Sequence, residues 1–174
     1  VSLVFYGWSE PVYLFLMVFT ILIDYEAGLL IQRAGTPRAR RGFMIAVIVL
    51  NLGLLGFFKY SNFIANGISA VIGYEGALPN IVLPIGISFY TFQLLSYVID
   101  VYRGDVKAQP KFHIVLLYAS LFHQCIAGPI VRYRDVEREL ENRRTTREDL
   151  AQGIVRFSIG LGKKVLIANV LGEF

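Results

Sequence analysis

Apolar residues run in long stretches along this chain, and short polar segments separate them. The stretches 11–32, 42–60 and 81–99 contain few charged residues, and residues 150–174 begin another such stretch. A helix that crosses a bilayer needs about 20 mostly apolar residues, and each complete stretch is close to that length. Residues 1–8 are typical of the end of a further helix. The pattern therefore predicts an all-α fold, a multi-pass transmembrane helical bundle.

Helix-breaking and capping residues mark where the stretches begin. Ser9 and Glu10 can cap a helix, and Pro11 suits the first turn of the helix that follows. Pro84 and Gly86 are expected in the first turns of the third stretch, where they disturb a helix least. These positions predict one helix from about residue 11 and another from about residue 81.

The polar segments differ in charge, and this difference predicts their side of the membrane. Residues 33–41 form an expected loop with four arginines and no acidic residue. Cytoplasmic loops carry an excess of Lys and Arg, so we expect this loop and the loop 103–111 in the cytoplasm. Residues 62–80 hold one acid, Glu75, and no basic residue, which predicts an external loop.

Residues 112–131 allow two topologies. They are just long enough to cross, but six arginines follow within residues 132–147, and a full crossing would place these outside. A re-entrant or tilted segment that turns at Gly128 and Pro129 would keep them inside, because irregular backbone at membrane depth is tolerated where protein buries it. We favour the re-entrant segment, followed by a cytoplasmic surface helix in residues 132–149.

The composition agrees with a membrane protein. Hydrophobic residues make up 55% of the chain and charged residues 17%, whereas a soluble domain is about a quarter charged. The net charge of +4 comes from basic residues beside apolar stretches, so it indicates topology and not a nucleic-acid partner. The single cysteine, Cys125, is expected to pack as a small apolar residue. Because the sequence begins at Val1 within apolar sequence, we expect an internal fragment of a longer protein.

Polar residues on the third stretch are the first candidates for a functional surface. Phe89, Gln93, Ser96 and Asp100 fall at helical spacing on one face, which should point into the protein. This face could form the polar wall of a substrate cavity. Alternatively, its side chains only make hydrogen bonds between helices, which contribute about 0.6 kcal/mol each.

Cations on the last stretch form a second candidate surface. One face carries small residues and cations, with Lys164 beside it: Gly153, Arg156, Gly160, Lys163 and Ile167. Cations that face lipid are costly, so these could attract a phosphate-bearing or acyl-thioester substrate. Alternatively, Lys163 and Lys164 extend to the membrane interface and only orient the helix.

The remaining polar residues give weaker signals. His123 and Gln124 lie in an apolar segment before the Gly-Pro turn, and Arg132 follows it; we include all three in the candidate substrate channel. His123 has no visible base or metal partner, and no metal-site spacing occurs. Asp24 lies well inside its apolar stretch, so we expect it to pair with a cation. The chain contains no complete catalytic constellation.

Four segments, taken in order, carry a resemblance to a known family. These are residues 57–63 (FFKYSNF), 83–104 (LPIGISFYTFQLLSYVIDVYRG), 122–133 (FHQCIAGPIVRY) and 160–172 (GLGKKVLIANVLG). Together they resemble the alginate O-acetylase and D-alanyl transfer branch of the membrane-bound O-acyltransferases. The resemblance covers nearly the whole chain, which would then be part of a single membrane domain. One position departs from the pattern, since His123 replaces a usual proline.

The resemblance implies a ring of helices around a tunnel in the bacterial inner membrane. It implies an acyltransferase with no bound cofactor, whose co-substrate is an acyl donor such as acetyl-CoA or an acyl-carrier protein thioester. The acyl group, acetyl in the simplest case, would pass toward an extracellular polysaccharide. Partners would be membrane lipid, the donor and a transferase outside the membrane. The family's catalytic histidine belongs to a later block that is absent from residues 1–174.

Two other classes of protein fit the same pattern. A polysaccharide or lipid transporter would use the polar helix faces as a pathway without chemistry, and a membrane scaffold would use them only for packing. A catalytic histidine block in the complete protein would distinguish the acyltransferase from both.

Overall fold

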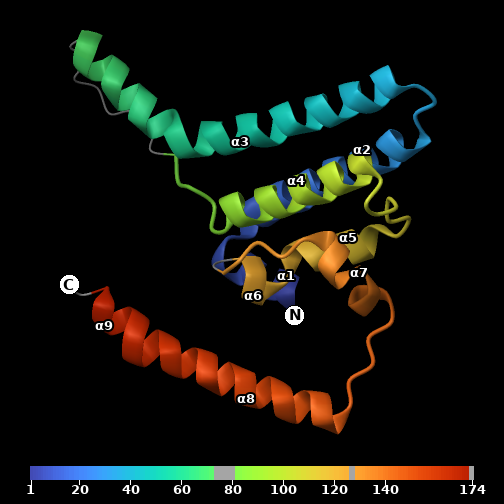
Figure 1. The fold of residues 1–174 in the computed structure, drawn as a ribbon. Coiled ribbons are helices and arrows are strands. Elements are labelled where there is room, and N and C mark those ends of the chain that lie inside the picture. The colour runs from blue at the N-terminus through green and yellow to red at the C-terminus, as the bar shows by residue number, and fades with distance from the viewer. Residues whose placement is uncertain (73–80, 126–127, 173–174) are drawn as a thin grey trace. The chain divides into compact units, whose positions relative to one another are not determined.

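The computed structural model describes residues 1–72, 81–125 and 128–172, which are helical and contain no strand. The α-helices, shown in Figure 1, are α1 (Ser2–Ser9), α2 (Pro11–Arg33), α3 (Pro37–Ile72), α4 (Ile87–Arg103), α5 (Phe112–Ser120), α6 (Phe122–Cys125), α7 (Tyr133–Glu141), α8 (Arg147–Lys163) and α9 (Asn169–Leu171). A π-helical turn, Lys164–Ala168, joins α8 to α9. The predicted all-α class is confirmed. The chain divides into two compact units, Val1–Leu140 and Glu141–Phe174.

Helices α2, α3 and α4 pack against one another and hold the core of the first unit. Met17 and Ile21 of α2 and Tyr90 and Val98 of α4 are fully buried. The closest approach involves Gly28 of α2, where a Cβ atom would lie only 3.0 Å from the Tyr97 hydroxyl of α4. A glycine at position 28 therefore lets α2 and α4 come together around a tyrosine.

The break between α1 and α2 falls where the sequence predicted it. Pro11 occupies the first helical position of α2, and Glu10 is the N-cap residue. Ser9 is not a cap, because it is the last residue of α1. The Glu10 carboxylate accepts a hydrogen bond from the backbone N–H of Ile85 at 3.0 Å, so this junction is fixed to the segment that leads into α4.

Helix α3 is longer at both ends than the sequence predicted. Its start at Pro37 reduces the expected loop 33–41 to three residues, 34–36. The expected external loop at residues 62–80 is wrong for residues 62–72, which continue the helix; residues 73–80 lie outside the described residues. Asn62 was expected in a loop, but it lies within the helix. Its side-chain Nδ2 donates to the Ile81 carbonyl at 2.7 Å, and its Oδ1 accepts the N–H of Ile81 at 2.9 Å.

Helix α4 begins later than predicted. Gly86 is its N-cap with φ of 73°, a left-handed conformation that glycine adopts without strain. Pro84 therefore precedes the helix, and its carbonyl accepts the N–H of Ile87 at 3.2 Å. The helix has 17 residues, or about 25 Å of length, which is shorter than the hydrocarbon core of about 30 Å.

Two of the described helices are long and apolar enough to cross a membrane, α2 over Pro11–Arg33 and α3 over Pro37–Ser69. Only 39% of the apolar stretch of α2 and 17% of that of α3 is buried. A core helix of a soluble protein would be mostly buried. Large exposed side chains such as Phe15, Phe19 and Phe57 instead offer lipid an apolar surface.

The second unit consists of a helix that begins at a capping box. Thr146 accepts the N–H of Asp149 at 3.1 Å, and Asp149 accepts the N–H of Thr146 at 2.9 Å. This box starts α8 at Arg147, and α7 ends at Glu141. The single surface helix predicted for residues 132–149 is therefore wrong, since two helices with a loop at 142–146 replace it. That residues 150–174 begin a membrane span stays a prediction.

Candidate functional site

The polar face of α4 packs against the chain segment that runs from α5 to α7. Gln93 and Asp100 are 1% and 0% exposed, and Ser96 lies between them on the same face. Phe89 is half-buried. The predicted inward face therefore exists, and its polar groups are engaged by the protein itself.

An ion pair joins the end of this face to the start of α7. The Arg132 guanidinium donates to both carboxylate oxygens of Asp100, through Nη2 to Oδ1 and through Nε to Oδ2 at 3.3 Å. The Asp100 side chain is 0% exposed and that of Arg132 is 32% exposed. The hydrogen bond to Asp100 raises the pKa of Arg132 further above its ordinary value, so the guanidinium stays charged. Two-point contact of this kind fixes direction as well as distance.

Two glutamines connect the same face to α6. Gln93 Nε2 donates to Gln124 Oε1 at 2.9 Å, and Gln124 is half-buried. The other amide oxygen, Gln93 Oε1, is buried and has no hydrogen-bond partner among the described residues. An unpaired buried acceptor is costly, so we expect a donor from outside the described contacts to satisfy this atom.

Tyr118 holds the returning chain against α5. Its hydroxyl donates to the backbone carbonyl of Val131 at 2.8 Å. The same hydroxyl lies 3.5 Å from Ser96 Oγ, and Ser96 in turn donates to the Gln93 carbonyl at 2.7 Å. The chain before α7 is therefore attached to α4 and α5 at two successive residues, Val131 and Arg132.

A cluster of buried tyrosines that the sequence pattern did not predict lies behind this face. Gln109 donates its backbone N–H to the Tyr97 hydroxyl and its side-chain Nε2 to the Tyr133 hydroxyl, each at 3.0 Å. The Tyr133 ring stands edge-on to Tyr97 and Tyr118, with centroids 5.0 and 5.2 Å away. Tyrosines within apolar stretches could have indicated it, because a buried phenol needs a hydrogen-bond partner.

These contacts favour one of the two topologies predicted for residues 112–131. Helix α5 has 9 residues, about 13 Å at 1.5 Å per residue, and cannot cross a bilayer core. Arg132 pairs with Asp100, three residues before α4 ends at Arg103. The basic segment therefore starts at the same end of the helices as the loop 103–111. The fold therefore favours the re-entrant segment, with Gly128 at φ of 130°, and the topology in the membrane stays a prediction.

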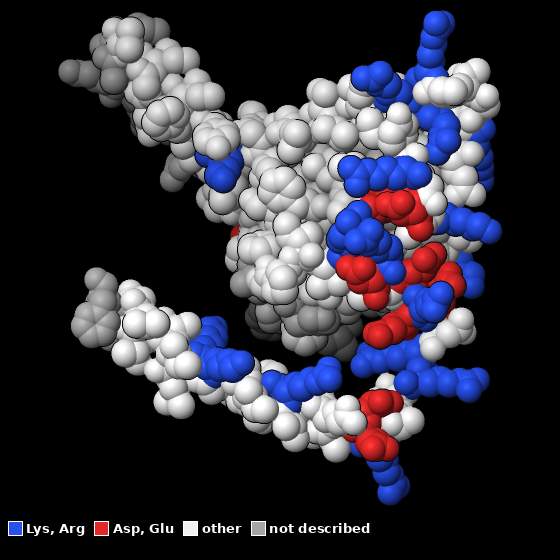
Figure 2. Space-filling model, viewed as in Figure 1, with Lys and Arg blue, Asp and Glu red and all other residues white. Residues whose placement is uncertain are grey.

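The two basic segments that were predicted to be cytoplasmic, residues 33–41 and 103–111, lie at the same end of the helices of the first unit. Arg40 donates through Nη2 to the Tyr102 carbonyl at 2.9 Å, and the Gln32 side chain accepts the N–H of Ala108. In Figure 2 the charged side chains of the first unit gather mainly at the end where α2 stops and α3 begins. This arrangement agrees with the predicted alternation of sides.

Asp24 does not have the partner that the sequence suggested. A cation was expected, but the fully buried carboxylate accepts both contacts from Asn51 Nδ2, at 3.1 and 3.0 Å. That prediction is wrong, because Asn51 is the polar residue of α3 that faces α2. Its Nδ2 also donates to the Val47 carbonyl at 3.0 Å.

The other candidate residues are placed as follows. His123 belongs to α6, and its side chain lies outside the described residues, as does that of Cys125. Arg156, Lys163 and Lys164 are exposed on the second unit. The π-helical turn that begins at Lys164 changes the helical register, so the predicted face is regular only up to Lys163. A role for these cations in substrate binding stays a prediction.

Comparison with known proteins adds the family. No family model matches the chain, and no solved structure matches it. The probable alginate O-acetylase AlgI of Pseudomonas aeruginosa is 39% identical over 98% of this chain, which spans 34% of that relative. The peptidoglycan O-acetyltransferase of Helicobacter pylori is 31% identical over 99% of the chain and 38% of its own length. The teichoic acid D-alanyltransferase of Bacillus subtilis is 28% identical over 55% of the chain and 25% of its own length.

These similarities and the fold define the class. The relatives confirm the resemblance that the four sequence blocks predicted, to the branch of the membrane-bound O-acyltransferases that contains the alginate O-acetylases and the D-alanyltransferases. Two described helices long and apolar enough to cross a membrane agree with this class. The chain spans about a third of the length of the curated relatives it matches.

Proposed function

We propose that the complete protein is a membrane-bound O-acyltransferase that passes an acyl group, acetyl in the simplest case, toward an extracellular polysaccharide. The observation that carries this proposal is similarity over 98% of the chain to a probable alginate O-acetylase. In the expected step, a base removes the proton of an acceptor hydroxyl, whose oxygen attacks the thioester carbonyl. The C–O bond forms, the C–S bond breaks, and the thiolate takes up a proton as it leaves.

The described part of the chain supplies positioning in this proposal. The α4 face holds the re-entrant segment through Asp100 with Arg132 and through Gln93 with Gln124. We place Gln93, Gln124 and Arg132 beside the substrate path, since Gln93 Oε1 has no hydrogen-bond partner among the described residues and Arg132 is partly exposed. Proton transfer belongs to a histidine elsewhere in the complete protein, so His123→Ala should retain acyl transfer.

The donor and the partners follow from the same proposal. A thioester such as acetyl-CoA or an acylated carrier protein would enter from the cytoplasmic side of the bacterial inner membrane. The cations Arg156, Lys163 and Lys164 suit the phosphates of such a donor. A transferase outside the membrane would take the acyl group onward, and the chain would form part of one multi-pass membrane domain.

Acyl transfer can be tested in the parent bacterium. The gene is deleted and restored, and base-labile acetyl is measured on the extracellular polysaccharide. In parallel, membrane vesicles with the complete protein receive acetyl-CoA labelled in the acetyl group. We expect loss and recovery of polymer acetylation and transfer of label into a base-labile ester. A deletion that stops polymer export but leaves the remaining polymer acetylated would instead indicate a transporter.

A further inference from the structure

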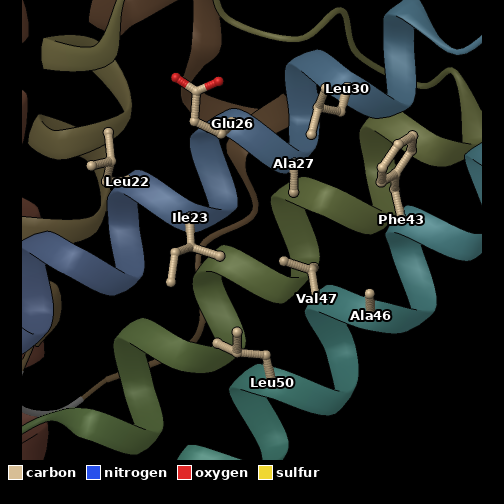
Figure 3. Close-up of a pocket in the computed structure, with 9 residues that line it drawn as sticks. All are labelled: Leu22, Ile23, Glu26, Ala27, Leu30, Phe43, Ala46, Val47 and Leu50. Atoms are coloured by element: carbon tan, nitrogen blue, oxygen red, sulfur yellow. The ribbon is translucent and has the colours of Figure 1, made fainter.

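An apolar groove runs between α2 and α3 in the first unit. It has a volume of about 380 Å³. Figure 3 shows the side chains that line it: Leu22, Ile23, Glu26, Ala27, Leu30, Phe43, Ala46, Val47 and Leu50. Glu26 is the one polar residue among them, and in this view its carboxylate points away from the α3 side chains. The surface on which an occupant would lie is therefore hydrocarbon.

The groove follows the two helices that are long enough to span a membrane. Its rims are exposed, since Leu22, Leu30, Phe43 and Leu50 are 39% to 43% accessible. From Leu22 to Leu30 is eight residues, or about 12 Å along the helix. A slot of this length, parallel to helices that cross the bilayer, matches the direction in which a lipid acyl chain lies.

One end of the groove is basic. Leu22, Glu26 and Leu30 follow one another at helical spacing, and Arg33 continues the same face at the end of α2. Arg33 is exposed and belongs to no ion pair among the described residues. On α3, Arg40 lies three residues before Phe43, at the same end of the groove as Arg33. Its guanidinium donates to the backbone carbonyl of Tyr102 and lies over the Tyr102 ring. Glu26 is seven residues from Arg33, about 10 Å along the helix, roughly one Debye length away.

We propose that this groove is a binding site for an anionic phospholipid. One acyl chain lies between α2 and α3, and the phosphate rests on Arg33 at the cytoplasmic end. Hydrocarbon along the slot and an unpaired cation at its mouth are the two features that such a lipid needs. The site does not depend on acyl transfer, and it is separate from the polar face of α4.

The test uses the complete protein, purified from membranes, with the variants Ala46→Trp and Arg33→Gln. Ala46→Trp fills the groove, and Val49→Trp, on the same helix but outside the lining, is its control. Each protein is placed in nanodiscs with photoactivatable phosphatidylglycerol, phosphatidylcholine or diacylglycerol, and crosslinked peptides are identified. We expect crosslinks to α2 and α3 that Ala46→Trp removes and Val49→Trp keeps. Arg33→Gln should lower the preference for phosphatidylglycerol over phosphatidylcholine about fivefold.

Three results would overturn the proposal. Equal crosslinking of all three lipids would show that Arg33 does not bind the phosphate. Unchanged crosslinking in Ala46→Trp would place the lipid outside the groove. An absence of crosslinks from the unaltered protein would mean that another part of the protein covers the groove. Thermal unfolding of each variant shows whether it is folded, and Arg33→Gln, at an exposed position, gives a result even if Ala46→Trp does not fold.

Discussion

The side chain of Arg132 forms an ion pair with that of Asp100, 32 positions earlier in the chain, and this contact holds the α5–α6 segment against α4. This pair places the start of α7 beside the end of α4. It also anchors the residues that lead into α7, whose Tyr133 is fully buried.

Removing either partner of this pair should destabilise the protein. Arg132→Gln leaves the fully buried Asp100 carboxylate without its partner, at a cost of roughly 3 kcal/mol. Asp100→Asn leaves a guanidinium that is partly exposed to solvent and should cost less. The double variant should lose little more than the worse single variant, because the interaction is already gone. Thermal unfolding of the complete protein in detergent measures this. Arg134→Gln is the control, because its contact with Asp135 is exposed on both sides and should contribute little. Additive losses in the double variant would contradict the coupling.

Topology can be measured with single cysteines in a Cys125→Ser background. We expect a membrane-impermeant maleimide to label Asn66→Cys on intact cells but not Ala39→Cys or Arg134→Cys. All three positions are exposed, and Ala39 and Asn66 lie near opposite ends of α3. Permeabilised cells, in which every variant should react, provide the control. Labelling of Arg134→Cys from outside would mean that residues 112–131 cross after all.

The cations of the second unit should affect use of the acyl donor. Arg156 and Lys163 are seven residues apart on α8 and share one face. Lys163→Gln should raise the donor concentration needed for half-maximal transfer while leaving the unfolding temperature unchanged. Arg147→Gln, an equal loss of charge at the start of the same helix, should leave both unchanged. A lower unfolding temperature with the same donor dependence would show that Lys163 is structural.

The start of α8 should loosen in acid. Hydrogen bonds from the Thr146 hydroxyl and backbone lower the pKa of Asp149 below its usual 3.8. A lowered folded-state pKa means that the stabilisation is complete above the unfolded value and is lost as the pH falls through the folded one. Hydrogen exchange at the start of α8, corrected for intrinsic rates, should change little from neutral pH to about pH 5 and accelerate below about pH 4. Asp149→Asn should remove most of this pH response; an equal response in both proteins would assign it elsewhere.

The sequence predicted helices well and their ends less well. Pro11 has no N–H to lose at the first position of α2, so it marked that boundary correctly. The start of α3 was not predicted correctly. Residues 33–41 were expected to form a loop, whereas Pro37 is the first residue of α3. At the other end, Asn62 finds its partners in Ile81, and such distant contacts leave no local pattern.

The sequence predicted which residues form the polar face of α4, but not which residues they contact. Helical spacing placed Gln93 and Asp100 on one inward face, as the structure has them. Their partners, Gln124 and Arg132, come from a segment whose return depends on the whole tertiary fold. Asp24 illustrates the same limit, because the residue that satisfies it is an amide on the next helix.

The contact between Gly28 and Tyr97 links the packing of α2 on α4 to the loop that follows α4. Tyr97 is held on one side by the bare backbone of α2 and on the other by the N–H of Gln109. If α2 tilts or slides against α4, the ring must follow, and it pulls the loop after α4 with it. Helix tilt responds to bilayer thickness, so a thinner or thicker membrane would shift the position of this loop without any ligand bound.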